Sequence, residues 1–145
     1  MVERHGTLYA AEHGWDASFE GLVARILADF AAGYDPAREA GWIAELDGRR
    51  AGSVFCVAGD ETGVAKLRAL IVDPPARGRG IGTLLVERCI SFAREAGYER
   101  LELWTTSDLE AAGRLYEAVG FRLVREEIEQ RFGTHITSQF MALEL

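Results

Sequence analysis

The sequence is poor in several residue types that would indicate particular classes of protein. Its 145 residues include two cysteines, three histidines and three prolines, and Lys66 is the only lysine. Cys56 and Cys89 fall in a predicted strand and a predicted helix, so we expect buried, reduced thiols rather than a disulfide framework or a catalytic nucleophile. The histidines are scattered and form no cluster with metal-ligand spacing, so we predict no bound metal.

Long apolar runs are also missing, and the charge balance is acidic. No apolar run reaches the length needed to span a membrane, and we recognise no signal peptide. The 16 basic and 23 acidic residues give a net charge of −7, which argues against nucleic acid as the main partner because phosphate binding needs a basic surface. We therefore expect a cytoplasmic protein, and 145 residues suit a single domain over 1–145.

Periodic apolar residues predict two helices at the start of the chain. Residues 2–13 can form a short helix with Leu8 and Tyr9 turned inward, and Asp16 or Ser18 can cap the helix that follows. That second helix carries one apolar face, because its large residues recur at intervals of three and four positions. These residues are Phe19, Leu22, Val23, Ile26, Leu27 and Phe30.

The rest of the chain alternates between predicted strands and helices. Asp47-Gly48 predicts a hairpin turn. A helix predicted at 82–96 connects the strands on either side of it, which makes those two strands parallel. Ser107-x-x-Glu110 predicts a capping box that opens a last helix. The predicted strands are 41–46, 50–58, 64–72, 100–105, 121–130 and 139–144.

A glycine-rich stretch, 72–82, joins the strand 64–72 to the helix 82–96. It reads Val-Asp-Pro-Pro-Ala-Arg-Gly-Arg-Gly-Ile-Gly. Backbone N–H groups point outward at a helix N-terminus and the helix dipole adds positive potential, so the stretch is suited to a phosphate or pyrophosphate. Its glycines permit positive φ and close approach of a ligand. The spacing differs from the Walker loop, which needs Gly-Lys-Ser/Thr, and from the G-x-G-x-x-G fingerprint of dinucleotide-binding proteins.

Two blocks of the sequence resemble the signatures of one enzyme family. The pattern V-x-P-x-x-[R/Q]-x-x-G-x-[G/A] resembles the acyl-CoA-binding motif of the GCN5-related N-acetyltransferases, the GNAT family. It is matched by Val72, Pro74, Arg77, Gly80 and Gly82. The block 112–121 is similar to a second signature of the family, A-x-x-L-Y-E-x-x-G-F. The order of predicted elements, αα-βββ-α-β-α-ββ, is that of the GNAT fold.

The resemblance implies an α/β protein, more narrowly α+β, with a mixed, mostly antiparallel twisted sheet of about six strands flanked by about four helices. Members usually have a strand before the first helix, whereas we expect none here. The stretches 5–16 and 35–45 also resemble the acetyltransferase half of MarR-type regulator fusions. Many members carry an asparagine seven residues before the signature tyrosine, where this chain has Leu109. Either Thr106 or Ser107 replaces that cofactor contact, or the contact is missing.

The cofactor implied by the resemblance is acetyl-CoA, with its pantetheine arm between the splayed C-terminal ends of the strands 64–72 and 100–105. The arm would pair with backbone groups of Leu70 and Val72, as an added strand does. Arg77 would either contact phosphate or shape the loop. The implied cofactor-binding residues are Leu70, Ile71, Val72, Arg77, Gly78, Arg79, Gly80, Ile81, Gly82, Thr83, Ser107 and Tyr116.

The reaction implied by the resemblance is direct transfer of an acetyl group to a primary amine of a small molecule or protein. Tyr116 is the candidate general acid, with a tyrosine packed on the sheet as the alternative. The Leu70 backbone N–H is a candidate for polarising the thioester carbonyl. Glu45 and Glu102 are candidate bases, but each could simply be solvated, and a water relay would need neither. The alternative to an enzyme is a non-catalytic acyl-CoA-binding module with a sensory or regulatory role.

The sequence does not name the amine acceptor. Lys66 and Arg68 are expected on one face of their strand with Leu70, because side chains alternate along a strand. They could bind the carboxylate of an acidic or amino-acid-like acceptor, or pair with internal acidic residues. Further candidates for the acceptor pocket are Glu45, Trp15, Trp42 and Trp104, although tryptophans of this kind more often belong to the core. The resemblance also allows a homodimer formed through edge strands near the C-terminus.

Overall fold

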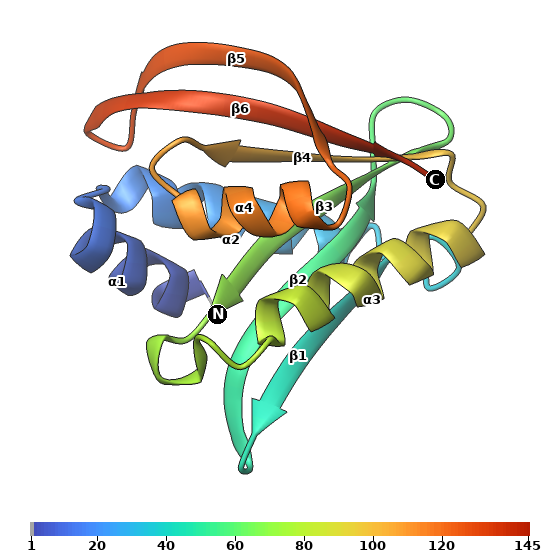
Figure 1. The fold of residues 1–145 in the computed structure, drawn as a ribbon, viewed down its shortest axis with the longest axis horizontal. Helices are drawn as coiled ribbons and strands as arrows, with labels where there is room; N and C mark the ends of the chain where they lie inside the picture. The colour runs from blue at the N-terminus through green and yellow to red at the C-terminus, as the bar shows by residue number, and fades with distance from the viewer. Residues whose placement is uncertain (1) are drawn as a thin grey trace.

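The computed structural model describes residues 2–145, and the chain begins with two helices that pack against each other (Figure 1). α1 spans Val2–His13 and α2 spans Ala17–Ala32. The Asp16 side chain accepts a hydrogen bond from the Ser18 N–H at 3.0 Å and so caps α2, as predicted. Within residues 2–145, no helix is both long and apolar enough to cross a membrane.

Three antiparallel strands follow the two helices. β1 spans Ala40–Leu46, β2 spans Arg49–Ala58 and β3 spans Val64–Val72. β1 and β2 are joined by a tight turn at Asp47 and Gly48, whose φ angles are 53° and 77°. Aspartate and glycine tolerate this left-handed conformation, which hairpin turns of two residues require. The predicted meander is confirmed.

A turn and a helix carry the chain from β3 to a parallel neighbour. The turn is the 3-10 helix η1 (Pro74–Ala76), the helix is α3 (Ile81–Glu95), and the neighbour is β4 (Arg100–Thr106). β3 and β4 pair only where residues 64–66 face residues 100–102. Beyond this point the two strands diverge, as their arrows show in Figure 1. The prediction of a parallel pair that splays apart is confirmed.

The start of α4 (Glu110–Ala118) corrects the predicted capping box. Its N-cap residue is Leu109 rather than Ser107, and no side chain caps it. The Ser107 N–H is instead bonded to the Thr137 carbonyl at 3.0 Å, which holds Ser107 against the neighbouring strand. The sequence pattern is local and carries no information about this contact.

The last two strands, β5 (Arg122–Arg131) and β6 (Thr134–Glu144), form a long hairpin. β6 begins at Thr134, five residues before the predicted start, so the prediction of 139–144 was too short. The reason is a tight turn at Phe132 and Gly133, with φ angles of 55° and 80°. Because the turn contains only two residues, the strands pair from Arg131 and Thr134 onward.

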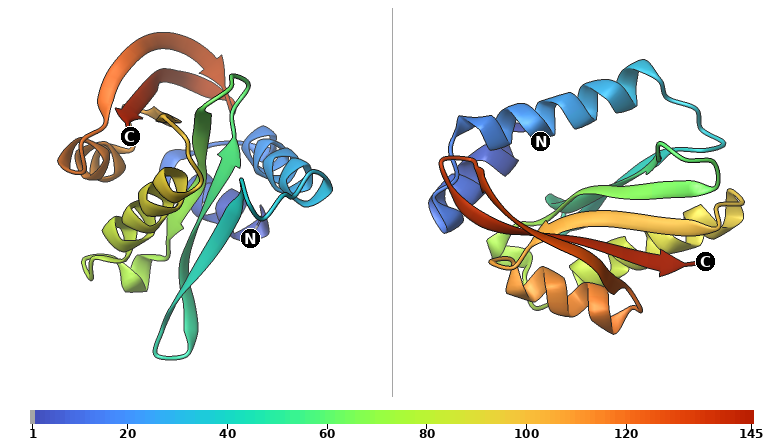
Figure 2. Two further views of the ribbon diagram at one scale, coloured as in Figure 1. Left: turned by 90° about the vertical axis from the view of Figure 1, so that its right-hand side faces the viewer. Right: turned by 90° about the horizontal axis from the view of Figure 1, so that it is seen from above.

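The six strands form one sheet in the order β1-β2-β3-β4-β6-β5. α3 and α4 lie on one face of the sheet, and α1 and α2 lie on the other (Figure 2). The larger core cluster packs between the sheet and α3, and it contains Cys56 and Cys89, which are buried and free as predicted. A second cluster is built around Trp15, Phe19 and Phe132. The predicted fold class is confirmed.

A bulge interrupts β3 near its end. Phe55 of β2 pairs with Arg68, and Ser53 pairs with Ile71, so β3 carries one extra residue between these pairs. Ala69 has a φ of 54°, a left-handed conformation that costs a non-glycine residue about 1–3 kcal/mol. The prediction that Lys66, Arg68 and Leu70 share a face is therefore wrong. After the bulge, Leu70 packs against the larger core cluster.

Candidate active site

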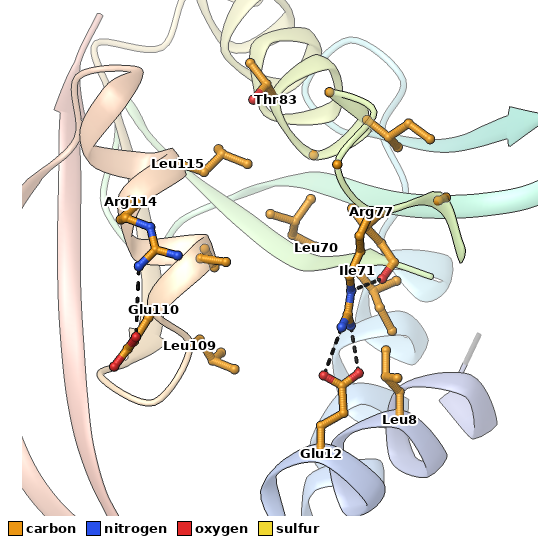
Figure 3. Close-up of a pocket in the computed structure, with 18 of the residues that line it drawn as sticks. Leu8, Glu12, Leu70, Ile71, Arg77, Thr83, Leu109, Glu110, Arg114 and Leu115 are labelled. Carbon is orange, nitrogen blue, oxygen red and sulfur yellow. Dashed lines mark hydrogen bonds and ion pairs between the residues drawn. The ribbon is translucent and has the colours of Figure 1, made fainter. Parts of the chain in front are cut away.

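A cleft of about 580 Å³, here called the wide cleft, opens where β3 and β4 diverge. Figure 3 shows Arg114 and Leu115 of α4 on one side of it and Leu8 and Glu12 of α1 on the other. Leu70 of β3 lies between these two walls. The wide cleft therefore lies beside the end of β3, where the sequence predicts the pantetheine arm of the cofactor, but its far wall is α4 with the residues before it rather than β4.

The loop between β3 and α3 lines the wide cleft with main chain. Gly78 and Gly80 have φ angles of 79° and 77°, which lets the chain turn sharply before α3 begins. The Leu84 N–H bonds to the Gly80 carbonyl at 3.0 Å, and no side chain caps the helix. The N–H groups of the first turn precede the hydrogen-bond ladder of α3, so they are available to bind an anion.

Arg77 is held by protein groups on two sides. Its Nε donates a hydrogen bond to the Val72 carbonyl at 3.2 Å. Its two terminal nitrogens bind the Glu12 carboxylate at 3.0 and 2.8 Å (Figure 3). The side chain thus ties the loop to α1 and to the end of β3. Of the two roles expected for Arg77, these contacts support the shaping of the loop.

Most of the predicted cofactor-binding residues line the wide cleft. They are Leu70, Ile71, Val72, Arg77, Gly78, Gly80, Ile81, Gly82 and Thr83. Arg79 and Ser107 do not line it, and Tyr116 lines a neighbouring cavity instead.

The sequence analysis missed the two walls that come from α1 and from α4 with the residues before it. These walls consist of Leu8, Tyr9, Glu12, Asp108, Leu109, Glu110, Ala111, Ala112, Arg114 and Leu115. The spacing of four between Leu8 and Glu12 places them on one helical face, but no local pattern connects that face with the glycine loop.

A second cavity, of about 90 Å³, lies beside the wide cleft and is here called the aromatic cavity. Six residues with aromatic rings line it, namely His5, Tyr9, Trp15, Phe19, Trp104 and Tyr116. Four residues line both cavities, namely Tyr9, Leu70, Leu109 and Ala112. The two cavities therefore meet beside the bulge of β3, where two different ligands can come into contact.

Tyr116 is a buried residue in the wall of the aromatic cavity. Its side chain is 5% exposed and packs against Phe121, with the ring centroids 5.8 Å apart. Burial raises the pKa of the Tyr116 hydroxyl well above its ordinary value, and the nearby Tyr9 and Cys89 raise it further. Burial likewise raises the pKa of Tyr9 to about 12, although the charge of Arg77 lowers it in part. Both hydroxyls therefore stay protonated at neutral pH.

Arg68 and Trp104, two of the predicted acceptor-binding residues, line the aromatic cavity, and so does Trp15. Trp15 is 3% exposed and also belongs to the second core cluster, so it serves both as core and as cavity wall. The Trp104 ring lies under the Arg131 guanidinium, whose carbon is 5.2 Å from the ring centroid.

Lys66 and Trp42, also predicted to bind the acceptor, lie away from both cavities. The Lys66 Nζ forms an ion pair with Asp60 at 3.1 Å, which supports the alternative of pairing with an acidic residue. Trp42 packs against Phe92, with the ring centroids 5.6 Å apart. That contact places Trp42 in the larger core cluster, on the α3 side of the sheet.

The two candidate bases, Glu45 and Glu102, also line neither cavity. Glu45 is exposed on β1. Glu102 pairs with Arg100 at 3.2 Å, with its side chain 39% exposed. Their positions agree with the alternative of solvated strand residues.

His5 is a residue of the aromatic cavity that the sequence analysis did not identify. It is 2% exposed, and its ring stacks on Tyr9 with the centroids 6.3 Å apart. The two residues are four positions apart on α1, so the spacing of a helical face was the signal available in the sequence. The cavity itself depends on contacts between α1, α2 and the sheet, which that spacing does not reveal.

Comparison with known proteins identifies the family. The Acetyltransferase (GNAT) family matches residues 7–121. The N-acetylaspartate synthetase of Danio rerio is 38% identical over 101 residues, which cover 69% of this chain and 36% of the relative. That of Rattus norvegicus is 40% identical over 81 residues, which cover 56% of this chain and 27% of the relative. The chain thus matches roughly a third of the length of these curated relatives.

Solved structures share the fold. The protein yncA of Salmonella typhimurium, solved with its cofactor acetyl-CoA, has a TM-score of 0.71 and 23% identity, covering 84% of this chain and 73% of that one. A Bacillus subtilis acetyltransferase in complex with CoA has a TM-score of 0.67 and 18% identity, covering 83% of each chain. Together with the family match over residues 7–121, these likenesses lead to one conclusion. The chain belongs to the GNAT family of acetyltransferases.

Proposed function

We propose that this protein is an acetyl-CoA-dependent N-acetyltransferase that acts on a primary amine of a small molecule or protein. The observation that carries the proposal is the meeting of two cavities beside the bulge of β3. One has a helix N-terminus suited to phosphates, and the other is lined by a buried, protonated tyrosine. Membership of the GNAT family and structural neighbours bound to acetyl-CoA or CoA support the choice of cofactor.

The wide cleft has the features that a CoA molecule requires. The uncapped N-terminus of α3 and the glycine loop before it would hold the pyrophosphate through N–H groups of residues 78–83. The diverging edges of β3 and β4 leave room for an extended amide chain beside Leu70. When bound, acetyl-CoA would supply an acetyl group activated as a thioester.

In this proposal, Tyr116 holds the proton that the departing thiolate needs. Its raised pKa keeps the hydroxyl protonated, and it lies within electrostatic reach of Tyr9, which lines both cavities. The Leu70 N–H is the proposed donor to the developing oxyanion, because Leu70 lines both cavities. No Asp or Glu among the described side chains lines the aromatic cavity, so we propose that the acceptor amine releases its proton to water and that Tyr116 regains a proton from water after each turnover.

The names of the curated relatives bear on the acceptor. Those from Danio rerio and Rattus norvegicus are called N-acetylaspartate synthetase, a name that implies an acetylated amino acid as their product. This supports a small amine as the acceptor here. Likeness to MarR-type regulator fusions, a cytoplasmic location and a homodimer stay predictions from the sequence.

The proposal is tested by calorimetric titration with acetyl-CoA, followed by a thiol-release assay over a panel of amines, amino acids and amino-terminal peptides. We expect saturable binding and acetylation of some members of the panel. Binding without any turnover would favour the alternative of a CoA-sensing module. If acetyl-CoA does not bind, the assignment of the wide cleft is wrong.

A further inference from the structure

The aromatic cavity contains one cationic side chain whose role the fold does not explain. Arg68 is half-buried and lines this cavity. Among the side chains that the structure describes, no carboxylate lies within ion-pair distance of its guanidinium. The nearby Asp60 is bound to Lys66 at 3.1 Å and its side chain is 93% exposed. A half-buried cation without an acidic partner is costly unless it serves a ligand.

The rest of the cavity wall favours a negatively charged ligand. The Trp104 Nε1 atom is buried and has no hydrogen-bond acceptor in the described part of the chain. The Arg131 guanidinium lies over the Trp104 ring, so a second positive charge is close. No acidic side chain lines the cavity among those that the structure describes. Donors and cations without a neighbouring acceptor are the arrangement that binds a carboxylate.

The place of Arg68 in β3 also sets the distance to the reaction site. Leu70, which lines both cavities, follows Arg68 by two residues. Two residues of a strand span about 7 Å, less where the bulge at Ala69 shortens the path. In an α-amino acid, one carbon atom separates the amine from the carboxylate. A carboxylate bound at Arg68 would therefore hold the amine near the point where the cavities meet.

We propose that the amine acceptor carries a carboxylate next to its amine, as a free amino acid does, and that Arg68 binds this carboxylate in the aromatic cavity. The inference rests on the proposed N-acetyltransferase function and specifies its substrate class. The cavity volume of about 90 Å³ and its aromatic wall suit the compact head of such a molecule rather than a polymer backbone.

The test compares each amino acid with its own amide, over a panel of free amino acids and the matching amino-acid amides. The amide keeps the side chain and the amine but lacks the negative charge. Both are assayed with the unchanged protein, with Arg68→Gln and with Arg49→Gln. The last variant removes the same charge from an exposed position of β2 and serves as the control. The amine of an amino-acid amide is less basic than the amine of the free amino acid, which by itself changes the rate. We therefore compare the ratio of kcat/KM for the acid to kcat/KM for the amide between variants. The difference in basicity is the same for every variant and cancels.

We expect Arg68→Gln to lower kcat/KM for the acids about 10- to 100-fold, which is typical for the loss of a charge-assisted hydrogen bond. Values for the amides should change less than about 3-fold, and Arg68→Lys should restore part of the loss. Arg49→Gln should leave the acid-to-amide ratio unchanged. The dissociation constant for acetyl-CoA should stay the same in all variants, which also shows that they are folded.

Equal losses for acids and amides would overturn the inference, because a structural role of Arg68 predicts that result. Acetylation of amines without carboxylates while no amino acid reacts would also overturn it, and would leave the proposed function intact. Acetyl-CoA binding without turnover on any amine overturns the inference together with the enzymatic part of the proposal. Failure to bind acetyl-CoA would instead show that the proposed function is wrong.

Discussion

The wide cleft and the aromatic cavity are built in different ways. The predicted part of the wide cleft comes from one stretch, 70–83, and its glycine loop offers main-chain N–H groups. The aromatic cavity is lined by side chains from α1, α2, β3, β4 and α4, which are separated by up to about a hundred positions in the sequence.

This difference bears on what each cavity can recognise. Main-chain groups are the same for any residue type, so a glycine loop at a helix N-terminus binds phosphates with few side-chain requirements. Side chains decide what enters the aromatic cavity, and they come from α1 and α2 as well as from β3, β4 and α4. We therefore expect substitutions in the two cavities to affect different steps of the reaction.

The largest effect is expected at Tyr116, in the wall of the aromatic cavity. Tyr116→Phe removes the hydroxyl but keeps the ring that packs against Phe121. We expect kcat to fall about 100- to 1,000-fold, as for the loss of a general acid, while the affinity for acetyl-CoA changes less than about 2-fold. Steady-state kinetics and calorimetry measure the two quantities. Tyr34→Phe, at a tyrosine that is 51% exposed, is the control, and an unchanged kcat in Tyr116→Phe would remove Tyr116 from the mechanism.

A charge at the glycine loop should affect the wide cleft alone. Gly80→Asp places a carboxylate at the start of α3, where phosphate is proposed to bind. We expect acetyl-CoA affinity to fall about 100-fold, because two negative charges a few ångströms apart repel by several kcal/mol at a partly screened site. Gly80→Asn has nearly the same shape and the same strain at a φ of 77° but no charge, so it should lose far less affinity. Equal losses in the two variants, measured by calorimetry, would mean that backbone strain rather than charge controls binding.

The ion pair between Arg77 and Glu12 joins the glycine loop to α1, and it should make a smaller contribution, to the stability of the fold. In a double-mutant cycle with Glu12→Gln and Arg77→Gln, we expect a coupling of about 0.5–1 kcal/mol in the free energy of unfolding. The bidentate geometry and partial burial favour the upper end of this range. The exposed pair of Arg114 and Glu110, 3.9 Å apart, is the control and should show a coupling near zero. Urea denaturation measures both, and equal couplings would contradict a specific role for the contact with α1.

The smallest effect is expected for moderately alkaline pH on kcat, because two tyrosines of the aromatic cavity, Tyr9 and Tyr116, stay protonated. Because burial raises the pKa of Tyr116 and raises that of Tyr9 to about 12, neither should lose its proton below pH 10. We therefore expect no alkaline fall in kcat between pH 8 and 10. Above pH 10, the unfolded chain ionises its tyrosines while the folded chain retains these two protons, so the free energy of unfolding should decrease up to about pH 12. A fall in kcat with an apparent pKa of about 9 would contradict protonated donors.

The elements were predictable to different degrees. The loop 72–82 was identified from its own residues, and nine of the twelve predicted cofactor residues line the wide cleft. By contrast, Ser107 was assigned to a capping box that the contact with Thr137 prevents. The bulge at Ala69 was also missed, because alanine carries no signal for a left-handed conformation.

The residues predicted to bind the acceptor also show that a sequence pattern does not reveal tertiary contacts. Lys66 and Arg68 have similar positions in the sequence pattern, two residues apart on one strand. In the structure, Lys66 pairs with Asp60, whereas Arg68 lines the aromatic cavity. Trp42 and Trp104 were equally good candidates, yet one packs against Phe92 in the core and the other lines the cavity.

Short-range physics was sufficient to identify the order of helices and strands, the parallel pairing of β3 with β4 and the glycine loop before α3. Each of these depends on periodicity, turn residues or spacing over a few positions, which residues express locally. The aromatic cavity and the contact of Arg77 with Glu12 depend on how α1 and α2 pack on the sheet. That packing brings together residues far apart in the chain, and no local pattern specifies which of them meet.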